Sequence, residues 1–537
     1  MNNISDLFTS DGWRKNIPLA FVIILTIVLF LDSLNHNFVI WDDPEYVVNN
    51  HLIKTHSFEG LQKIFSTSII GMYNPLPFLI YSLIHRFFGL DPQVFHFFNL
   101  VFHIIATILA YRFTFTLTKR HETASIVALL FAIHPMHVSV VAWVSQTKTS
   151  LCVIFYFSAL INYISYVRDN YRIKYLVYVA LFFVLAVISK PSAVTIAPML
   201  FLLDYYLSRD LNKKIFIEKI PFFTIALFFG ILTLLTHTGD SIFEVDHNYS
   251  FINNLLIANY SIVFYINKLI VPLNLSAIYP YPENSTFLPL KYYLSIPVIP
   301  TLLFLIYKSG KFRKEIIFGL LFFIIAISVL IRIVPSGFFR AANRYTYLSY
   351  TGLFFIIAQY ITYVIDNRFS YASKIRTPVI AFLFILIVFY SYRTTIRVDT
   401  WGNTIVLFDD VIQKNPRVPV AYNNRGFAKM LSGDTAGALA DYEEALAIDP
   451  TFVDAYLNRG GLHLNVGNVD SALEDYSKAI EINPDCGPAF FNRGLIKISQ
   501  EDIPGAMEDL IKADYLGVKQ AQEKIQYLSS ISVNLTN

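Results

Sequence analysis

Long apolar runs, repeated through the first three quarters of the chain, most limit what it can fold into. A helix needs ~20 apolar residues to cross a bilayer, and such runs recur between charged or Pro-containing loops. Only 15% of the 537 residues are charged, against about 25% in soluble domains. We therefore expect an all-α, polytopic membrane helix bundle of about eleven spans. The expected spans are 17–35, 95–117, 122–140, 150–167, 174–189, 192–207, 221–237, 292–307, 315–332, 346–364 and 376–392.

The charge of the loops predicts an orientation. Basic loops such as Lys119-Arg120 and Lys213-Lys214 fall on one side of the expected bundle, and the positive-inside rule makes this side cytoplasmic. An odd number of spans then exports the C-terminal part. Two further apolar stretches, 74–90 and 251–271, have polar or Pro interruptions. We expect both to lie in the membrane interface rather than to cross it.

The charge balance also bears on partners and location. The net charge of +3 indicates no nucleic-acid partner, because the basic residues lie in short loops between apolar runs. The partner that we expect around the membrane part is the lipid bilayer. We expect a multi-pass protein of a bacterial inner membrane with its C-terminal part on the periplasmic side. In a eukaryote, the equivalent is the endoplasmic reticulum membrane with a lumenal C-terminal part.

A repeat replaces the apolar runs after residue 395. Ala421-Tyr422-Asn423-Asn424-Arg425-Gly426 recurs 34 residues later at 455–460 and again at 489–494. This is the period of tetratricopeptide helix pairs, which stack into an α-solenoid that binds peptides or proteins on a concave face. No nucleophile, metal set or phosphate loop is seen in these units. The expected domains are 1–395 (membrane), 396–418 (linker or capping helix) and 419–537 (repeats near 419–452, 453–486 and 487–520, then a C-terminal helix).

An acidic couplet, Asp42-Asp43, stands where the first span ends, with Glu45 close behind. A carboxylate at the membrane centre costs roughly 2.5–3.5 kcal/mol on insertion scales, so acids at the edge of the hydrocarbon are candidate functional residues. The alternative is an ordinary solvated loop.

Several cations lie on the exported side, where the loop rule disfavours them. They are Lys148, Lys190, Arg332, Arg340 and Arg344. A cation held at this face needs an anion. That anion is either the couplet, which makes the pairing structural, or a ligand phosphate, which planar guanidinium groups bind in bidentate fashion. We favour the ligand, because the cations outnumber the acids.

Histidines give a weaker signal. His134 and His137 lie near the exported end of the third span, and His96 and His103 share one face of the second. Pairs at this spacing without a placed third ligand are poor evidence for a metal site. We assign no metal, although a divalent cation would suit phosphate chemistry.

The couplet, the cations, the histidine segment and the attached repeats together resemble a known family. Its membrane half resembles glycosyltransferases of the GT-C superfamily, and the whole chain is similar to the transmembrane and tetratricopeptide-repeat O-mannosyltransferases and their bacterial relatives. One segment departs from that family: Gln146-Thr147-Lys148-Thr149 stands in place of a basic-plus-acidic sequence, and only Lys148 carries over. The matching segments are Trp41-Asp42-Asp43 with 49–50, 88–90 with 95–100, His134-Pro135-Met136-His137 with 141–143, 189–195 with 203–205, and Asn343-Arg344-Tyr345-Thr346-Tyr347-Leu348.

The resemblance implies a polyprenyl-phosphate sugar as donor, a protein Ser/Thr hydroxyl as acceptor, and inversion at the anomeric carbon. Phosphate is already a good leaving group, so the reaction needs one carboxylate as proton acceptor and cations for the leaving charge. We expect Asp42 to be the base and Asp43 to face a cation or a backbone amide. The remaining assignments are Lys190, Arg340, Arg344 and Lys148 for the donor phosphate, and Tyr46, Tyr345, His137 and Tyr279 for the sugar or acceptor.

Other readings stay open at this stage. The same chemistry on a lipid or surface-glycan acceptor is one, and a non-enzymatic scaffold anchored in the membrane is another. A transporter would show two related halves, which the chain lacks. A scaffold needs only one span, and eleven argue against it. Which sugar, which polyprenol and which acceptor are used is not written in the sequence.

Overall fold

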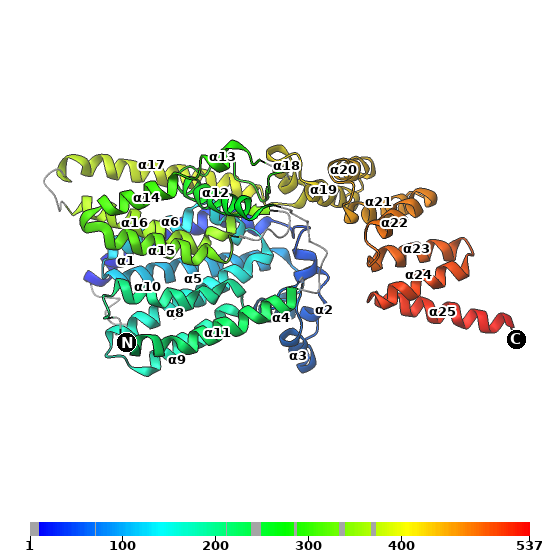
Figure 1. Ribbon diagram of the computed structural model, residues 1–537, viewed down its shortest axis with the longest axis horizontal. Coiled ribbons are helices and arrows are strands. Elements are labelled where there is room, and N and C mark those ends of the chain that lie inside the picture. The colour runs from blue at the N-terminus through cyan, green and yellow to red at the C-terminus, as the bar shows by residue number, and fades with distance from the viewer. Residues whose placement is uncertain are drawn as a thin grey trace. The chain divides into compact units, whose positions relative to one another are not determined.

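The computed structural model describes residues 10–69, 71–210, 212–237, 249–283, 287–331, 339–366 and 372–536. Arg332, one of the predicted exported cations, lies outside them. The chain divides into two compact units, 1–403 and 404–537, and both are almost entirely helical (Figure 1). The chain is a polytopic membrane helix bundle followed by a tetratricopeptide α-solenoid.

The membrane unit begins with α1 and a short helix. A loop follows, which ends in the acidic couplet and leads into a π-helical turn. Its first half contains α1 Ser10–Phe30, η2 Leu31–Asn35, η3 Pro44–Val48, α2 His51–Lys54, α3 Phe58–Ser66, α4 Pro75–Phe88, α5 Pro92–Thr118, α6 His121–Ile133, η4 Pro135–His137, α7 Val138–Val141, η5 Val144–Gln146, α8 Thr147–Arg168, α9 Ile173–Val187, η6 Pro191–Thr195 and α10 Ile196–Tyr206.

The second half of this unit ends in the longest helix of the described chain. It contains α11 Lys213–His237, α12 Phe251–Ile270, β1 Tyr279–Pro280, α13 Leu290–Tyr293, α14 Val298–Lys308, η8 Gly310–Phe312, α15 Arg313–Ser328, β2 Phe339–Ala341, η9 Asn343–Tyr345, α16 Thr346–Ile365 and α17 Ala372–Asp399.

Each of the eleven expected spans coincides with a helix. In the described part of the chain, seven helices are long and apolar enough to cross a membrane. An eighth is the pair 121–133 and 135–141, which bends by 55° at His134. The remaining three expected spans are shorter helices: α9, α10 and α15. The stretches 74–90 and 251–271 form α4 and α12, and neither is among the helices that meet the length and composition test.

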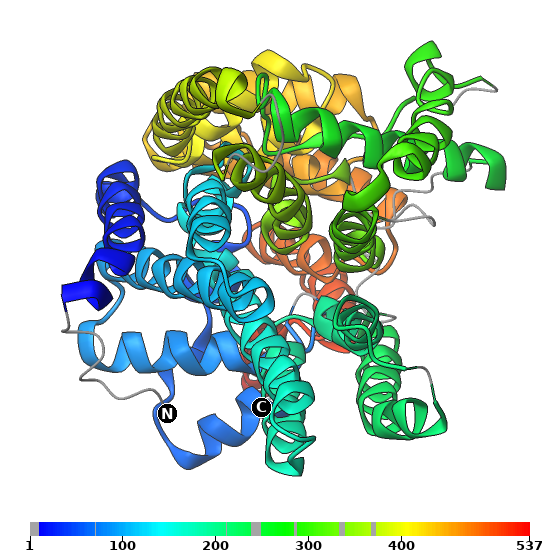
Figure 2. The ribbon, with the colours of Figure 1, turned by 90° about the vertical axis from the view of Figure 1, so that its left-hand side faces the viewer.

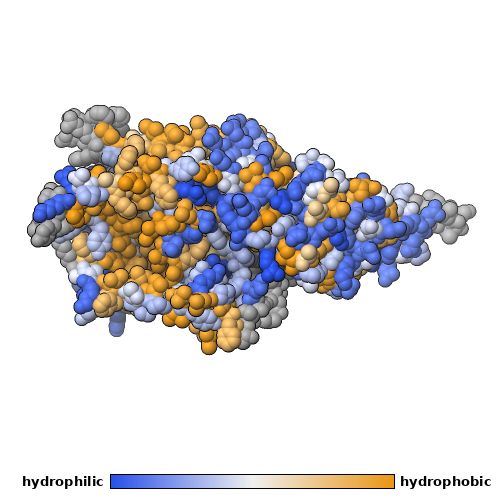
Figure 3. Space-filling model, turned by 90° about the horizontal axis from the view of Figure 1, so that it is seen from above, coloured by the Kyte–Doolittle hydropathy of each residue, from blue (hydrophilic) through white to orange (hydrophobic). Residues whose placement is uncertain are grey.

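The helices of the membrane unit pack side by side, with α5 against α6 and α8, and α16 against α6 and α15. Figure 2 views this bundle from one end and shows α1 at its edge. The outward side chains are apolar on α1, α11 and α17, where Val28, Leu234 and Phe384 are each more than 60% exposed. These exposed apolar surfaces (Figure 3) would be unfavourable in water and fit a lipid environment.

Two glycines allow one unusually close helix crossing. A Cβ placed on Gly319 of α15 would lie 2.4 Å from the carbonyl oxygen of Gly352 on α16. Small residues at such crossings let helix backbones approach in membranes, where packing drives association. The crossing holds α15 and α16 together. The C-terminal part of α15 and the segment just before α16 reach the candidate site.

A short antiparallel pair of strands joins two loops of the membrane unit. Tyr279 of β1 pairs with Ala341 of β2, and Pro280 pairs with Phe339. The pairing ties the loop after α12 to the segment that leads into η9 and Arg344.

The repeat unit consists of antiparallel helix pairs. Each pair packs through a glycine on its first helix: a Cβ on Gly426 would lie 3.0 Å from the Tyr442 ring, and one on Gly460 would lie 2.9 Å from the Tyr476 ring. In the third pair, Leu510 faces Gly494 instead. The helices are α18 Thr404–Lys414, α19 Pro419–Leu431, α20 Thr435–Ile448, α21 Val453–Asn465, α22 Val469–Ile482, α23 Gly487–Ser499, α24 Ile503–Tyr515 and α25 Lys519–Thr536.

Candidate active site

The two aspartates of the couplet have different surroundings. Asp43 is fully buried. Its Oδ2 accepts the backbone N–H of Val39 at 2.8 Å, and its Oδ1 accepts the backbone N–H of Ser145 at 2.9 Å and the Ser145 hydroxyl. Burial raises the pKa of Asp43 to about 7, although the hydrogen bonds from Ser145 and Val39 act to lower it. Asp43 therefore fastens the couplet to the turn before α8 and has little room to meet a substrate.

Asp42 is the accessible member of the pair. Its side chain is 25% exposed, and its Oδ2 lies 3.5 Å from Nζ of Lys148, whose side chain is only 6% exposed. The same ammonium lies 4.1 Å from the centre of the Tyr46 ring, a favourable cation–π arrangement. A partly open carboxylate beside a buried cation can take a proton from a ligand that enters from the open side.

Lys190 extends the group of cations from another direction. Its Nζ donates to Oγ1 of Thr149 at 3.0 Å, and Thr149 follows Lys148 on the first turn of α8. Burial lowers the pKa of Lys190 to about 7, and the nearby charges of Arg344 and Lys148 lower it further, while Cys152 opposes them. Three cations therefore lie close enough to repel one another.

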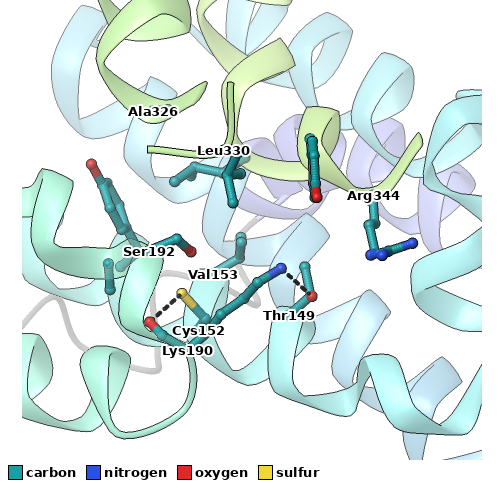
Figure 4. Close-up of a pocket in the computed structure, with 12 residues that line it drawn as sticks. Thr149, Cys152, Val153, Lys190, Ser192, Ala326, Leu330 and Arg344 are labelled. Carbon is teal, nitrogen blue, oxygen red and sulfur yellow. Dashed lines mark hydrogen bonds between the residues drawn. The ribbon is translucent and has the colours of Figure 1, made fainter. Parts of the chain in front are cut away.

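A small pocket opens beside these cations. It is lined by residues of α8, η6, α15 and η9–α16, among them Thr149, Lys190, Arg344 and Tyr345. In Figure 4, the Lys190 amine points across the pocket toward Thr149, on the side where Arg344 lies. In the described part of the chain, neither Lys190 nor Arg344 has an acidic side chain within 4 Å. Such a pocket has an electrostatic demand for an anion.

Aromatic rings surround Arg344. Its guanidinium carbon lies 5.3 Å from the centre of the Trp143 ring, 5.2 Å from that of Phe339 and 5.6 Å from that of Tyr345. These rings fix the guanidinium and keep it poorly hydrated, which strengthens its attraction for a phosphate.

The structure brings together only part of the predicted set. Asp42, Lys148, Lys190, Arg344 and Tyr345 lie around one region, as just described. Tyr46 is also there but is fully buried, so its ring supports Lys148 and offers no face to a sugar.

The other predicted residues lie elsewhere. Arg340 packs between Tyr260 and Phe264 of α12, at 4.7 and 4.9 Å from the ring centres. The Tyr279 hydroxyl is used up by Asn343 Oδ1 and the Ser276 N–H, each at 2.9 Å. His137 is completely buried, with Nδ1 2.8 Å from the carbonyl oxygen of Phe131. The assignment of these three to the donor or acceptor is not supported by their positions.

Sequence reasoning missed the residues that hold the others in place. Ser145 binds Asp43, Thr149 binds Lys190, and Asn99 of α5 donates to the carbonyl oxygen of Trp143 at 3.0 Å. Ser and Thr are too common in such a chain to attract attention. Among the described residues, no three His, Cys, Asp or Glu side chains are grouped to hold a metal ion.

Comparison with known proteins gives matches in both units. The family described as dolichyl-phosphate-mannose-protein mannosyltransferase matches residues 73–237. The tetratricopeptide repeat family matches residues 453–486, and a second repeat family matches 428–467. The fold and these matches define a multi-pass membrane protein with tetratricopeptide repeats, of which residues 73–237 are similar to that mannosyltransferase family.

The relatives are more specific. A protein O-mannosyl-transferase of Caenorhabditis elegans is 23% identical over 82% of this chain and 63% of its own length. A protein O-mannosyl-transferase of Homo sapiens is 32% identical over 26% of this chain and 16% of its own length. The chain thus spans less than two thirds of the relatives it matches. In sequence it is similar to these protein O-mannosyl-transferases.

Among solved structures, ArnT from Cupriavidus metallidurans bound to undecaprenyl phosphate matches 88% of this chain and 76% of its own, with 12% identity and a TM-score of 0.42. The oligosaccharyltransferase AglB from Archaeoglobus fulgidus matches 73% of this chain and 56% of its own, with 14% identity and a TM-score of 0.41.

Proposed function

We propose that this chain is an inverting membrane glycosyltransferase that moves a mannose-like hexose from a polyprenyl-phosphate carrier to Ser or Thr hydroxyls of exported proteins. The observation that carries this proposal is the partly open carboxylate of Asp42, paired with Lys148, close to two further cations, Lys190 and Arg344, that have no acidic partners in the described chain. The homology to protein O-mannosyl-transferases supports the sugar and the acceptor.

The donor phosphate occupies the pocket between Lys190 and Arg344. A bound phosphodiester carries one negative charge, and the departing phosphate monoester carries two. One cation ~4 Å from that additional charge contributes about 4 kcal/mol at an effective dielectric constant of ~20. Fixed cations therefore bind the transition state more tightly than the ground state, which is what accelerates the step.

Asp42 accepts the proton. As the acceptor oxygen attacks the anomeric carbon, the bond between that carbon and the phosphate oxygen breaks, and its electron pair leaves with the phosphate. The hydroxyl proton passes to Asp42. Attack from the face opposite the leaving group inverts the configuration. No acid is needed for the leaving group, so one carboxylate suffices.

Asp43 and Lys148 position the base. Asp43 holds the couplet against the turn at Ser145 through two accepted hydrogen bonds, and a third, from Val39, closes its own loop. Lys148 forms an ion pair with Asp42 and so fixes the direction of its carboxylate. Ser145, which binds Asp43, and Lys148 lie three residues apart where α8 begins, so the base and the phosphate site keep a constant relation.

The proposed location follows from the charge of the loops. The site and the repeats face the exported side, which is periplasmic in a bacterium and lumenal in the endoplasmic reticulum. There the repeats recruit the acceptor protein or a partner that presents it.

The test is a transfer assay with the purified full-length chain in lipid vesicles. Polyprenyl-phosphate mannose is offered with a Ser/Thr-containing peptide, and the anomeric configuration of the product is read by nuclear magnetic resonance. We expect an α-linked product from a β-linked donor. Transfer to a lipid or glycan acceptor alone would replace the acceptor in this proposal, and hydrolysis or transfer with retention would overturn the mechanism.

A further inference from the structure

Three tryptophans from distant parts of the membrane unit form one stack. The ring of Trp41 lies 4.9 Å from that of Trp143 at an angle of 22°, and Trp143 lies 5.2 Å from Trp401 at 26°. The chain contains only four tryptophans. Trp143 and Trp401 are each 1% exposed, so the stack is internal. It unites the couplet loop, the segment before α8 and the end of α17.

The stack is directly connected to the candidate base. Trp41 precedes Asp42, and Trp143 lies two residues before Ser145, which binds Asp43. Asn99 holds the backbone of Trp143 through its carbonyl oxygen. The central ring is therefore fixed by α5, and each outer ring transfers the position of its own segment to it.

The turn that carries Trp401 holds the couplet loop at a second point. The backbone N–H of Asn37 donates to the carbonyl oxygen of Gly402 at 3.1 Å. The segment from Asn37 to Trp41 is thus attached to the turn after α17 at both ends. Asn37 is held by the hydrogen bond, and Trp41 is held through the ring of Trp143. Asp42 follows immediately, so its position depends on where this turn lies.

We propose that Trp401 is a positioning residue for the transfer reaction, which keeps Asp42 at its working distance through the Trp143 and Trp41 rings. This role rests on the proposed function. Removing the third ring uncovers one face of Trp143 and loosens the loop before Asp42. Misplacing a reacting group by about 1 Å can cost on the order of 10²-fold in rate. The donor phosphate contacts Lys190 and Arg344, and Phe339 and Tyr345 hold the Arg344 guanidinium in addition to Trp143. Donor binding therefore changes less than the rate.

The experiment compares Trp401→Phe, Trp401→Leu and Trp401→Ala in the full-length chain in vesicles. Phe can stack, Leu fills space without stacking, and Ala does neither. Tyr392→Ala is the matched control, because this aromatic residue lies on α17, just before the turn that carries Trp401, with 64% of its surface exposed. For each variant, kcat and the KM for polyprenyl-phosphate mannose are measured, together with the exciton-coupled circular dichroism of stacked indoles.

We expect kcat to fall at least ~10-fold in the Leu and Ala variants, to stay within ~3-fold in the Phe variant, and to be unchanged in Tyr392→Ala. The donor KM should move less than ~3-fold in all of them. The exciton signal of Trp41 with Trp143 should persist in the Phe variant and weaken in the Leu variant, which remains informative if the Ala variant does not fold.

Two results would overturn the inference: wild-type kcat in Trp401→Leu, or a lowered kcat while the signal of Trp41 with Trp143 is unchanged. Failure of the proposed function looks different. The wild-type chain would then transfer no sugar, whereas the exciton signals of the variants would still report whether Trp401 fixes the loop.

Discussion

The two units of this chain use their cations in opposite ways. In the repeats, Arg425, Arg459 and Arg493 each donate two hydrogen bonds to the aspartate 16 residues further on. In the membrane unit, Lys190 and Arg344 have no acidic partner among the described residues. A planar bidentate pair is complete in itself, whereas a buried cation without a partner is costly unless something else supplies the charge.

This difference separates structural charges from functional ones. The aspartates of the repeats, Asp441, Asp475 and Asp509, occur once per unit at the same place and hold the two helices of each pair together. The two cations of the membrane pocket, Lys190 and Arg344, come from separate segments of the chain and converge on one space. Function is therefore expected where charges converge without compensation.

The largest effect is expected at the base. Asp42→Asn should lower transfer by about 10³-fold, because general-base catalysis contributes about 10²–10⁴-fold. The measurement is kcat in the vesicle assay. Glu59→Gln is the control, since Glu59 is an exposed carboxylate that pairs only with the neighbouring Lys63. Near-normal transfer by Asp42→Asn would move the base elsewhere.

The uncompensated cations come next. Arg344→Ala should reduce kcat/KM for the donor by about 10²-fold, in the range found when one donor to a developing negative charge is removed. Lys63→Ala, on the exposed surface pair, should have no effect. If Arg344→Ala bound the donor and transferred sugar normally, the cations without acidic partners would not be functional, and the contrast between the two units would be wrong.

A compensated charge should affect stability instead of chemistry. Asp475→Asn breaks the bidentate contact with Arg459, whose side chain is 23% exposed, so we expect a loss of ~1–3 kcal/mol. Hydrogen exchange of residues 453–486 measures this loss locally. Lys478→Ala, which removes an exposed pair with Glu481, should change stability by less than about 0.5 kcal/mol. Slower chemistry in Asp475→Asn with a short peptide acceptor would contradict this assignment.

The smallest effect is a dependence on pH. Lys190 has a pKa of about 7, and only its protonated form attracts phosphate. Donor KM should therefore rise up to ~10-fold from a pH of about 6 to about 8 as the lysine loses its proton. Donor titrations across this range measure the change. Lys190→Arg stays charged and should flatten the profile; a profile unchanged by that substitution would assign the titration to another group.

Much of this architecture could be predicted from the sequence. The 34-residue spacing of Arg425, Arg459 and Arg493 predicts stacked helix pairs, and the apolar runs predict the bundle. The couplet, Lys148, Lys190 and Arg344 were found because charges at a membrane boundary are exceptional.

The structure separates some of the predicted site residues where local backbone geometry decides the direction of a side chain. Arg340 and Arg344 are four residues apart, a spacing that places side chains together on a helix. Here Arg340 lies on β2 and Arg344 in η9, so they point to different surroundings. The partner of Tyr279, Asn343, is 64 residues away and is determined by tertiary packing. The contact of His137 with Phe131 depends on the bend between α6 and η4, which the apolar pattern does not predict. Trp401 gave no signal, because nothing near it in the sequence indicates a ring 258 residues away.

The crossing of Gly319 and Gly352 has a consequence for which donors fit. Seven residues, or about two helical turns, separate it from Ala326 on one helix and Tyr345 on the other, and both of these line the pocket. A larger residue at either glycine would push α15 and α16 apart and widen the opening of the pocket. In the proposed reaction, the two glycines therefore set how wide a donor the pocket admits.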